Sequence, residues 1–243
     1  MNARIAMAGA ALAVVAVLML LGAALGYRAG LVGLPTAFLL LRWGAYVGGA
    51  AAVISLLALV LTLARPRGER RALAPAGLGL LLGAALFGFA ASQFYRARGV
   101  PPIHDITTDW NDPPSFAAVL PLRANAPNKV DYGGAEVAAQ QRNAYPDIGP
   151  VTLSVPPEQA FERALAAVRA MGWDLVASDP SAGRIEATDT TFWFGFKDDV
   201  VVRVRPANDG SRIDVRSLSR VGRGDVGTNA RRIRAYLRLL AES

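Results

Sequence analysis

Three long apolar runs without a charged residue or histidine fill the first 94 residues and constrain the fold more than any other feature. They cover residues 5–27, 43–64 and 73–94. Each run is long enough to cross a bilayer, because about 20 helical residues span the hydrocarbon core. We therefore expect a transmembrane anchor of three helices over residues 1–98, followed by a water-soluble domain.

The first apolar run has a second interpretation, as a cleaved signal peptide. Cleavage near Ala23 or Ala24 would leave two spans and the same large domain. The run is longer than the apolar segment of a signal peptide, which has about 7 to 15 residues. We therefore favour an uncleaved helix.

Arginines beside the spans predict the orientation of the chain. The loop 65–71 carries four arginines against one acid, Glu69, and short loops rich in arginine stay in the cytoplasm. Arg4 then lies on the cytoplasmic side, and the predicted loop 28–42 lies outside with the large domain. The two arginines that follow the third span oppose this orientation weakly. We expect a multi-pass protein of the bacterial inner membrane with a periplasmic domain.

The net charge of +7 belongs to the anchor and not to the domain. Residues 1–98 carry nine arginines against one acid, which gives +8, whereas residues 99–243 carry 17 basic against 18 acidic side chains, which gives −1. A nucleic-acid-binding domain carries its own basic surface, so we expect no nucleic-acid partner. The absence of cysteine and the single histidine exclude thiolate and multi-histidine metal sites within one chain. We expect neither a cofactor nor a resident metal.

Glycines recur at four-residue spacing in the spans, which lets helices approach closely. The repeats are Gly22, Gly26 and Gly30, then Gly44 with Gly48, and Gly79 with Gly83. One interpretation is a compact anchor of three helices. The other is a homo-oligomer that associates through one glycine face.

The soluble part divides into an irregular segment and a region of regular structure. Residues 99–148 are rich in Pro, Asn, Asp and Gly, which predicts turns and extended chain with one short helix at 134–141. Residues 149–243 alternate as strands and show helical apolar stripes. The expected strands are 151–155, 173–178, 184–192, 196–205 and 212–221, and the expected helices follow Pro156 and cover 228–242.

This order of elements predicts an α+β fold, with an antiparallel sheet covered by two helices on one face. Asn208, Asp209 and Gly210 are a strong hairpin signal between the last two strands. Strict alternation of apolar and charged residues predicts that the opposite face is wetter. On that face we expect arginines to pair with acids across strands.

Several segments of the soluble part resemble the bacterial and plastid family called domain of unknown function 1499. They are PPIHDITTD at 101–109 with DPPSF at 112–116, AAQQ at 138–141 with YPDI at 145–148, TTFWFGFKDD at 190–199 and SLSRVG at 217–222. The likeness covers about residues 101–241. The resemblance implies a domain that faces the envelope or lumen, often after membrane helices, and it implies no reaction.

The segment from residue 104 to residue 112 holds most of the candidate ligand-binding side chains. They are His104, Asp105, Thr107, Thr108, Asp109 and Asp112. In an extended chain His104 and Asp105 point to opposite sides, so Asp105 is badly placed to orient His104 as a triad acid would. Three roles stay open: a structural clamp that bonds backbone groups, a ligand site, and a metal or catalytic site. A bend could bring Asp105, Asp109 and Asp112 together around Ca²⁺.

An aromatic cluster and a set of arginines supply the other candidates. On a continuous strand Phe192, Phe194 and Phe196 would share one face and fill the core, while Trp193 would line a pocket or reach the lipid headgroups. Arg220 belongs to a series of arginines between residues 203 and 238. These arginines form either a solvated surface or a site for an anionic headgroup.

The sequence thus predicts an integral membrane protein with an extracytoplasmic binding or scaffolding domain. Its expected ligand is a membrane lipid or another envelope component, and its further partners would be envelope proteins or copies of itself. The alternative function is that of a hydrolase or metal-dependent enzyme built on His104 and Asp105.

Overall fold

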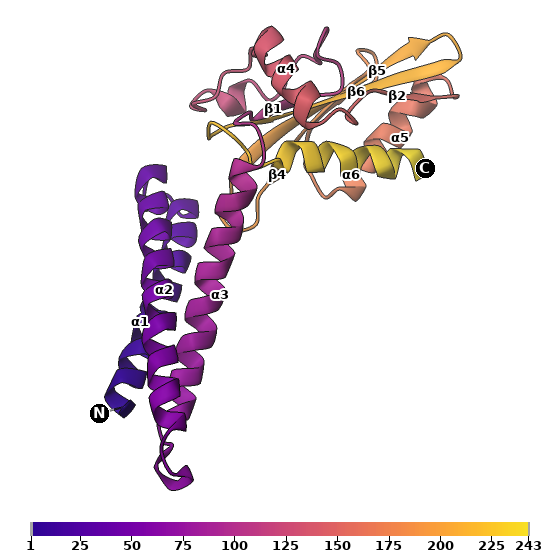
Figure 1. Ribbon diagram of the computed structural model, residues 1–243. Coiled ribbons are helices and arrows are strands. Elements are labelled where there is room, and N and C mark those ends of the chain that lie inside the picture. Colours follow the sequence, from indigo (N-terminus) through magenta and orange to yellow (C-terminus); the bar gives the residue numbers. More distant parts are fainter. Residues whose placement is uncertain (1, 243) are drawn as a thin grey trace. The chain divides into compact units, whose positions relative to one another are not determined.

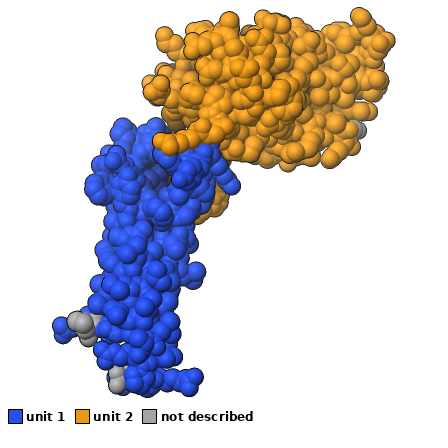
Figure 2. Space-filling view, viewed as in Figure 1, with its two compact units in different colours: residues 1–96 blue, residues 97–243 orange. Residues whose placement is uncertain are grey.

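The computed structural model describes residues 2–242, apart from the side chain of Glu69, and is drawn in Figure 1. Contacts within the chain divide it into two compact units, residues 1–96 and residues 97–243 (Figure 2). Residues 99–148 pack with the later strands and helices inside the second unit. We call the first unit the anchor and the second unit the soluble domain.

The anchor consists of long helices joined by short connections. They are α1 (Asn2–Arg28), α2 (Leu34–Leu63) and α3 (Leu73–Arg98), with a 3-10 turn, η1 (Arg67–Glu69), before α3. Among the described residues, these three helices are long and apolar enough to cross a membrane. The predicted loop 28–42 is wrong, because α2 already begins at Leu34 and includes Arg42. Pro35 lies in the first turn of α2, where proline is tolerated.

Glycines let the anchor helices approach one another. A Cβ atom at Gly79 would lie 2.2 Å from Ser55 Oγ and 2.9 Å from the backbone nitrogen of Ala10. A Cβ atom at Gly83 would lie 2.5 Å from the carbonyl oxygen of Gly48. These positions therefore serve packing within one chain, as small residues do between membrane helices. Gly22, in contrast, has no other atom within 4 Å of such a Cβ.

The soluble domain is an α+β fold, as predicted. Its elements are β1 (Asp105–Thr107), η2 (Pro121–Arg123), α4 (Gly134–Ala144), β2 (Val151–Leu153), α5 (Pro157–Ala170), β3 (Asp174–Asp179), β4 (Arg184–Thr190), β5 (Lys197–Ala207), β6 (Gly210–Ser219) and α6 (Thr228–Glu242). Within the described residues the sheet is antiparallel, in the order β1-β6-β5-β4-β3, with β2 paired to β6 as well. The predicted hairpin turn is confirmed, since Ala207 pairs with Gly210.

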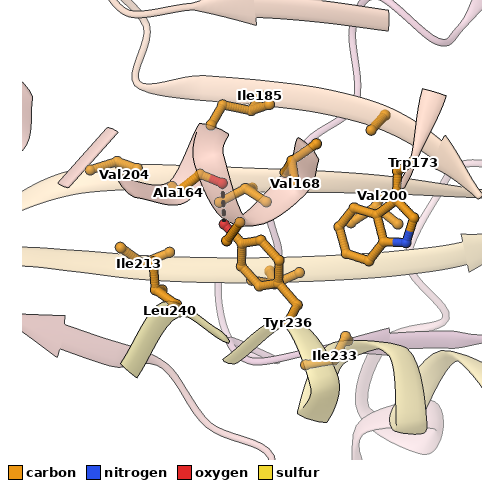
Figure 3. Packing of buried hydrophobic residues seen from close by; sticks show 14 of the residues in the cluster. Ala164, Val168, Trp173, Ile185, Val200, Val204, Ile213, Ile233, Tyr236 and Leu240 are labelled. Atoms are coloured by element: carbon orange, nitrogen blue, oxygen red, sulfur yellow. Dashed lines mark hydrogen bonds between the residues drawn. The ribbon is translucent and has the colours of Figure 1, made fainter. Parts of the chain in front are cut away.

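Helices α5 and α6 cover one face of the sheet and form the apolar core (Figure 3). Tyr236 of α6 is fully buried, stacks on Trp173 with ring centroids 5.4 Å apart, and donates its hydroxyl to the carbonyl of Ala164 at 3.0 Å. The bond crosses from α6 to α5, so it fixes the two helices against each other. Burial raises the pKa of Tyr236, and the phenol stays neutral.

The opposite face of the sheet is buried, and the prediction of a wetter face is wrong. Residues 108–132 lie over it, and a small apolar cluster forms between Phe116, Val119, Val201 and Leu218. The expected pairs across strands are present, for example Arg203 with Asp214 at 3.1 Å. An irregular segment lacks hydrophobic periodicity, so the sequence did not predict that residues 108–132 cover this face of the sheet.

The turn between β4 and β5 also differs from its prediction. Residues 191–196 interrupt the expected strand, because Gly195 adopts a left-handed φ of 66° and Phe196 donates its backbone N–H to Thr191 Oγ1 at 2.9 Å. Phe192 is 77% exposed, so the expectation that it fills the core is wrong. We call residues 191–196 the aromatic turn.

Candidate functional site

Asp105 forms a buried ion pair with Arg216, in the middle of β6. Asp105 Oδ1 accepts from Arg216 Nε at 2.9 Å, and Oδ2 accepts from Nη2 at 2.8 Å. The guanidinium also lies over the rings of Phe116 and Tyr132, at 5.2 and 5.6 Å from their centroids. Both oxygens of this carboxylate are therefore engaged by one cation, in the bidentate geometry that gives strong pairing.

The two predicted threonines connect β1 to its neighbours. The side-chain amide of Gln141, on α4, accepts from the backbone N–H of Thr107 at 3.0 Å and donates to its carbonyl at 2.6 Å. Thr108 Oγ1 accepts from the backbone N–H of Val215 at 2.9 Å. Thr107 and Thr108 are both buried, and they hold α4 and β6 to the end of β1.

Asp109 and Asp112 share a cluster of arginines with Asp214. Asp109 Oδ2 lies 2.8 Å from Arg212 Nη2, and Asp112 Oδ2 lies 2.8 Å from Arg205 Nη1. The hydrogen bond from Arg205 lowers the pKa of the Asp112 carboxyl group, and the positive charge of Arg203 lowers it further. Asp109 also closes an Asx turn, since its Oδ1 accepts from the backbone N–H of Asn111 at 3.2 Å.

Arg220 binds Asp199, which is fully buried. Its Nη2 lies 2.8 Å from Asp199 Oδ1, while Arg123 Nη1 lies 2.5 Å from Oδ2. Burial raises the pKa of Asp199, but hydrogen bonds from Arg220, Thr188 and Arg123 outweigh burial and hold the pKa below its usual value. Sequence reasoning missed Arg123 and Asp199, because the partners are far apart in the chain and Arg123 lies in the irregular segment.

Glu186 was also missed, and it organises the segment that covers the sheet. It is fully buried on β4. Its Oε1 accepts from the backbone N–H groups of Ala117 and Ala118 at 2.9 and 3.0 Å, and its Oε2 accepts from Val119 at 3.0 Å. Successive N–H groups that converge on one carboxylate form a nest for an anion. The available signal was an acid between two apolar residues, Ile185 and Ala187.

A surface hollow of about 430 Å³ lies beside His104. The polar residues that line it include His104, Lys129, Asp131, Glu136 and Gln140. His104 Nδ1 lies 3.2 Å from the carbonyl oxygen of Arg223. A carbonyl only accepts, so Nδ1 donates in this contact. The hollow therefore offers both hydrogen-bond donors and acceptors.

A second hollow, of about 420 Å³, shares Asp131 with the first and is also lined by Phe116, Tyr132 and Arg216. The hydroxyl of Tyr132 is buried and has no hydrogen-bond partner among the described residues. Burial, and after it the carboxylate of Asp105, raises the pKa of Tyr132 to about 12. The phenol is therefore a neutral donor at physiological pH.

The carboxylates of the 104–112 segment do not gather into a metal site. Asp105 binds Arg216, whereas Asp109 and Asp112 share Arg203. Among the described side chains, which exclude that of Glu69, no three of the types His, Cys, Asp and Glu lie close enough to hold a metal ion. Of the other candidates, Trp193 lies in the aromatic turn and is 58% exposed.

Comparison with known proteins gives one match. The model of a protein family described as "Protein of unknown function (DUF1499)" matches residues 105–240. This range runs from the first residue of β1 into α6 and covers more than half of the chain. No curated protein and no solved structure matches the chain.

Proposed function

Because the chain belongs to the DUF1499 family, whose function is unknown, we propose a role from its own residues: a binding module that the bacterial inner membrane carries on its periplasmic side. Three apolar helices support the membrane location. Four arginines between α2 and α3 support a cytoplasmic loop there. An odd number of spans then puts the soluble domain outside the cytoplasm.

The hollow beside His104 carries the proposal of binding. A concave site with a few convergent polar groups is the usual form of a small-molecule site. Lys129 attracts an anionic group, while Asp131 and Glu136 accept hydrogen bonds from hydroxyl or ammonium groups. We assign the site to the polar part of an envelope molecule, such as a lipid headgroup.

The alternative of a hydrolase has less support. Both carboxylate oxygens of Asp105 bind Arg216, so they do not orient the imidazole of His104. The ring meets the carbonyl of Arg223 instead.

Native mass spectrometry of the full-length protein, released from gentle detergent, tests the binding role. We expect the wild type to retain a small molecule and Lys129→Ala to lose it. Arg169→Ala is the control, because Arg169 is an exposed cation of α5 that does not line the hollow. Wild-type protein without bound mass, or equal retention in all three proteins, would contradict the proposal.

The orientation has its own test. Alkaline phosphatase fused after residue 243 is expected to be active, since this enzyme folds only where disulfides form, outside the cytoplasm. The same reporter inserted in the loop between α2 and α3 is expected to be inactive. The reverse pattern would place the soluble domain in the cytoplasm.

A further inference from the structure

The aromatic turn presents large apolar side chains to solvent. Phe192 is 77% exposed and Trp193 is 58% exposed, and their rings meet edge to face with centroids 5.2 Å apart. We propose that this turn inserts Phe192 and Trp193 into the headgroup region of the same membrane that the three helices span. Indole and phenyl rings favour this depth, where Trp is enriched in membrane proteins.

The register of the sheet places the aromatic turn at the end where the chain enters the soluble domain. Asp105, the first residue of β1, pairs with Leu218, and Leu218 also pairs with Asp199 near the start of β5. The aromatic turn directly precedes β5. Since β1 and β5 flank β6, Asp105 and Asp199 are about 10 Å apart across the sheet, and the chain entry and the turn lie at the same end of it.

The connection after α3 is attached to this same end of the domain. A Cβ atom at Gly227 would lie 3.7 Å from the side chain of Val100. Ile103 is buried, and its carbonyl accepts from the backbone N–H of Asp225 at 3.3 Å. Helix α3 ends at Arg98, so only Gly99 separates the helix from the first residue in contact with the domain.

The last turns of α3 have the composition of a membrane interface. Phe94 and Tyr95 are exposed and are followed by Arg96 and Arg98, a pattern of aromatic and basic residues that marks the boundary of the bilayer. The stretch from Tyr95 to Val100 spans at most about 17 Å even when fully extended. The tether is therefore short enough for this end of the sheet to reach the headgroups.

Exposed cations accompany the aromatic side chains. Lys197 follows the turn directly, and the carbonyl of Arg223 contacts His104 beside the start of β1. The side chains of Lys197 and Arg223 are exposed. Basic residues near a membrane surface gain affinity from anionic lipids, so the partner that fits this end of the domain is an anionic lipid surface. This inference does not depend on a ligand in the hollow beside His104.

Tryptophan quenching in the full-length protein tests the inference. The protein is reconstituted in nanodiscs with lipids brominated near the headgroup, and the quenched fraction of tryptophan emission is measured. Trp43 lies in α2 and is a common background. We expect Trp193→Phe to lower the quenched fraction relative to wild type. The matched variant Trp110→Phe removes an unquenched residue and is expected to raise it. A rise of the same size in both variants would overturn the proposal.

The absence of cysteine permits a second measurement with single spin labels. One label replaces Trp193, and the other replaces Asp209 in the β5–β6 turn, at the opposite end of the sheet. Accessibility to oxygen is expected to exceed accessibility to a water-soluble nickel reagent at position 193, with the reverse at position 209. Equal access to the nickel reagent at both positions would contradict membrane insertion.

Discussion

Asp105 and Arg216 join the first strand of the soluble domain to β6 through two hydrogen bonds, of 2.9 and 2.8 Å. Both side chains are less than 10% exposed. The arginine also donates to the carbonyls of Pro114 and Val130, at 3.3 and 2.6 Å. The buried guanidinium of Arg216 thus binds both β1 and two backbone carbonyls of the segment that covers the sheet.

Removal of the charge at Asp105 is expected to destabilise the domain strongly. In Asp105→Asn the guanidinium of Arg216 stays buried without a counterion, which costs about 3–5 kcal/mol of unfolding free energy. Asp147→Asn is the control, because Asp147 pairs with Arg234 at the surface, where a pair contributes about 0–1 kcal/mol. Thermal unfolding measures both, and equal losses would contradict a special role for Arg216.

Substitution of Glu186 is expected to loosen the cover of the sheet. Glu186→Gln retains a single acceptor oxygen for three N–H groups, and each buried group left unpaired costs about 1–3 kcal/mol. The amides of residues 117–119 should then exchange hydrogen faster than in the wild type. Glu162→Gln, on the exposed side of α5, should leave their exchange unchanged. Slow exchange in both variants would show that other contacts hold the segment.

The carboxyl group of Asp225 is expected to make stability depend on pH in mild acid. Burial raises its pKa above the usual 3.8, although the backbone N–H groups of Asn229 and Gly227 oppose burial. The folded state therefore binds this proton more tightly than the unfolded state does. The stabilisation is complete below about pH 4 and is lost as the pH rises through the raised pKa.

The Asp225→Asn variant isolates this effect. It should lack the part of the pH slope of the unfolding midpoint that Asp225 contributes. Asp209→Asn, in the exposed β5–β6 turn, should keep the wild-type slope. Parallel curves for all three proteins would contradict the predicted contribution.

A large side chain at a close contact between the anchor helices is expected to disrupt their packing. Isoleucine at Gly79 would overlap Ser55 and the backbone of α1, and overpacking costs about 1–3 kcal/mol or more. Gly79→Ile should therefore lower the thermal stability of the full-length protein in detergent. Gly77→Ile is the matched control, because nothing lies within 4 Å of a Cβ atom there. Equal stability of the two variants would mean that the helices do not pack as described.

Periodic segments of the sequence predicted their structure well. The stripe with Ala230, Ile233 and Leu240 on α6 is buried in the core, as its helical spacing indicated. The hairpin predicted from Asn208, Asp209 and Gly210 is present, with Ala207 paired to Gly210. The aromatic turn was predicted only in part. The expected strands ended at Phe192 and resumed at Phe196, but the alternation of the phenylalanines suggested a shared strand face, which the left-handed Gly195 breaks.

The contacts of the candidate site could not be predicted, because they depend on pairs distant in sequence. Asp105 was selected from its local segment, but nothing near it indicates Arg216 as its partner. Glu186 binds backbone N–H groups, and a sequence carries no pattern for a backbone donor. Asp105 and Glu186 therefore show why the sequence did not predict buried charges on the sheet face opposite α5 and α6.

The pairing of β1 with β6 has a consequence for how the domain is made. Asp105 leaves the ribosome long before Leu218, its partner in the register. The residues that cover the sheet are therefore synthesised before the strands they cover, and pairing between such distant segments is slow. The proline and aspartate content of the covering segment keeps it soluble until these strands have been synthesised. The sheet can close only after β6 has been synthesised, so a product truncated before β6 would expose an unfinished sheet to quality-control proteases.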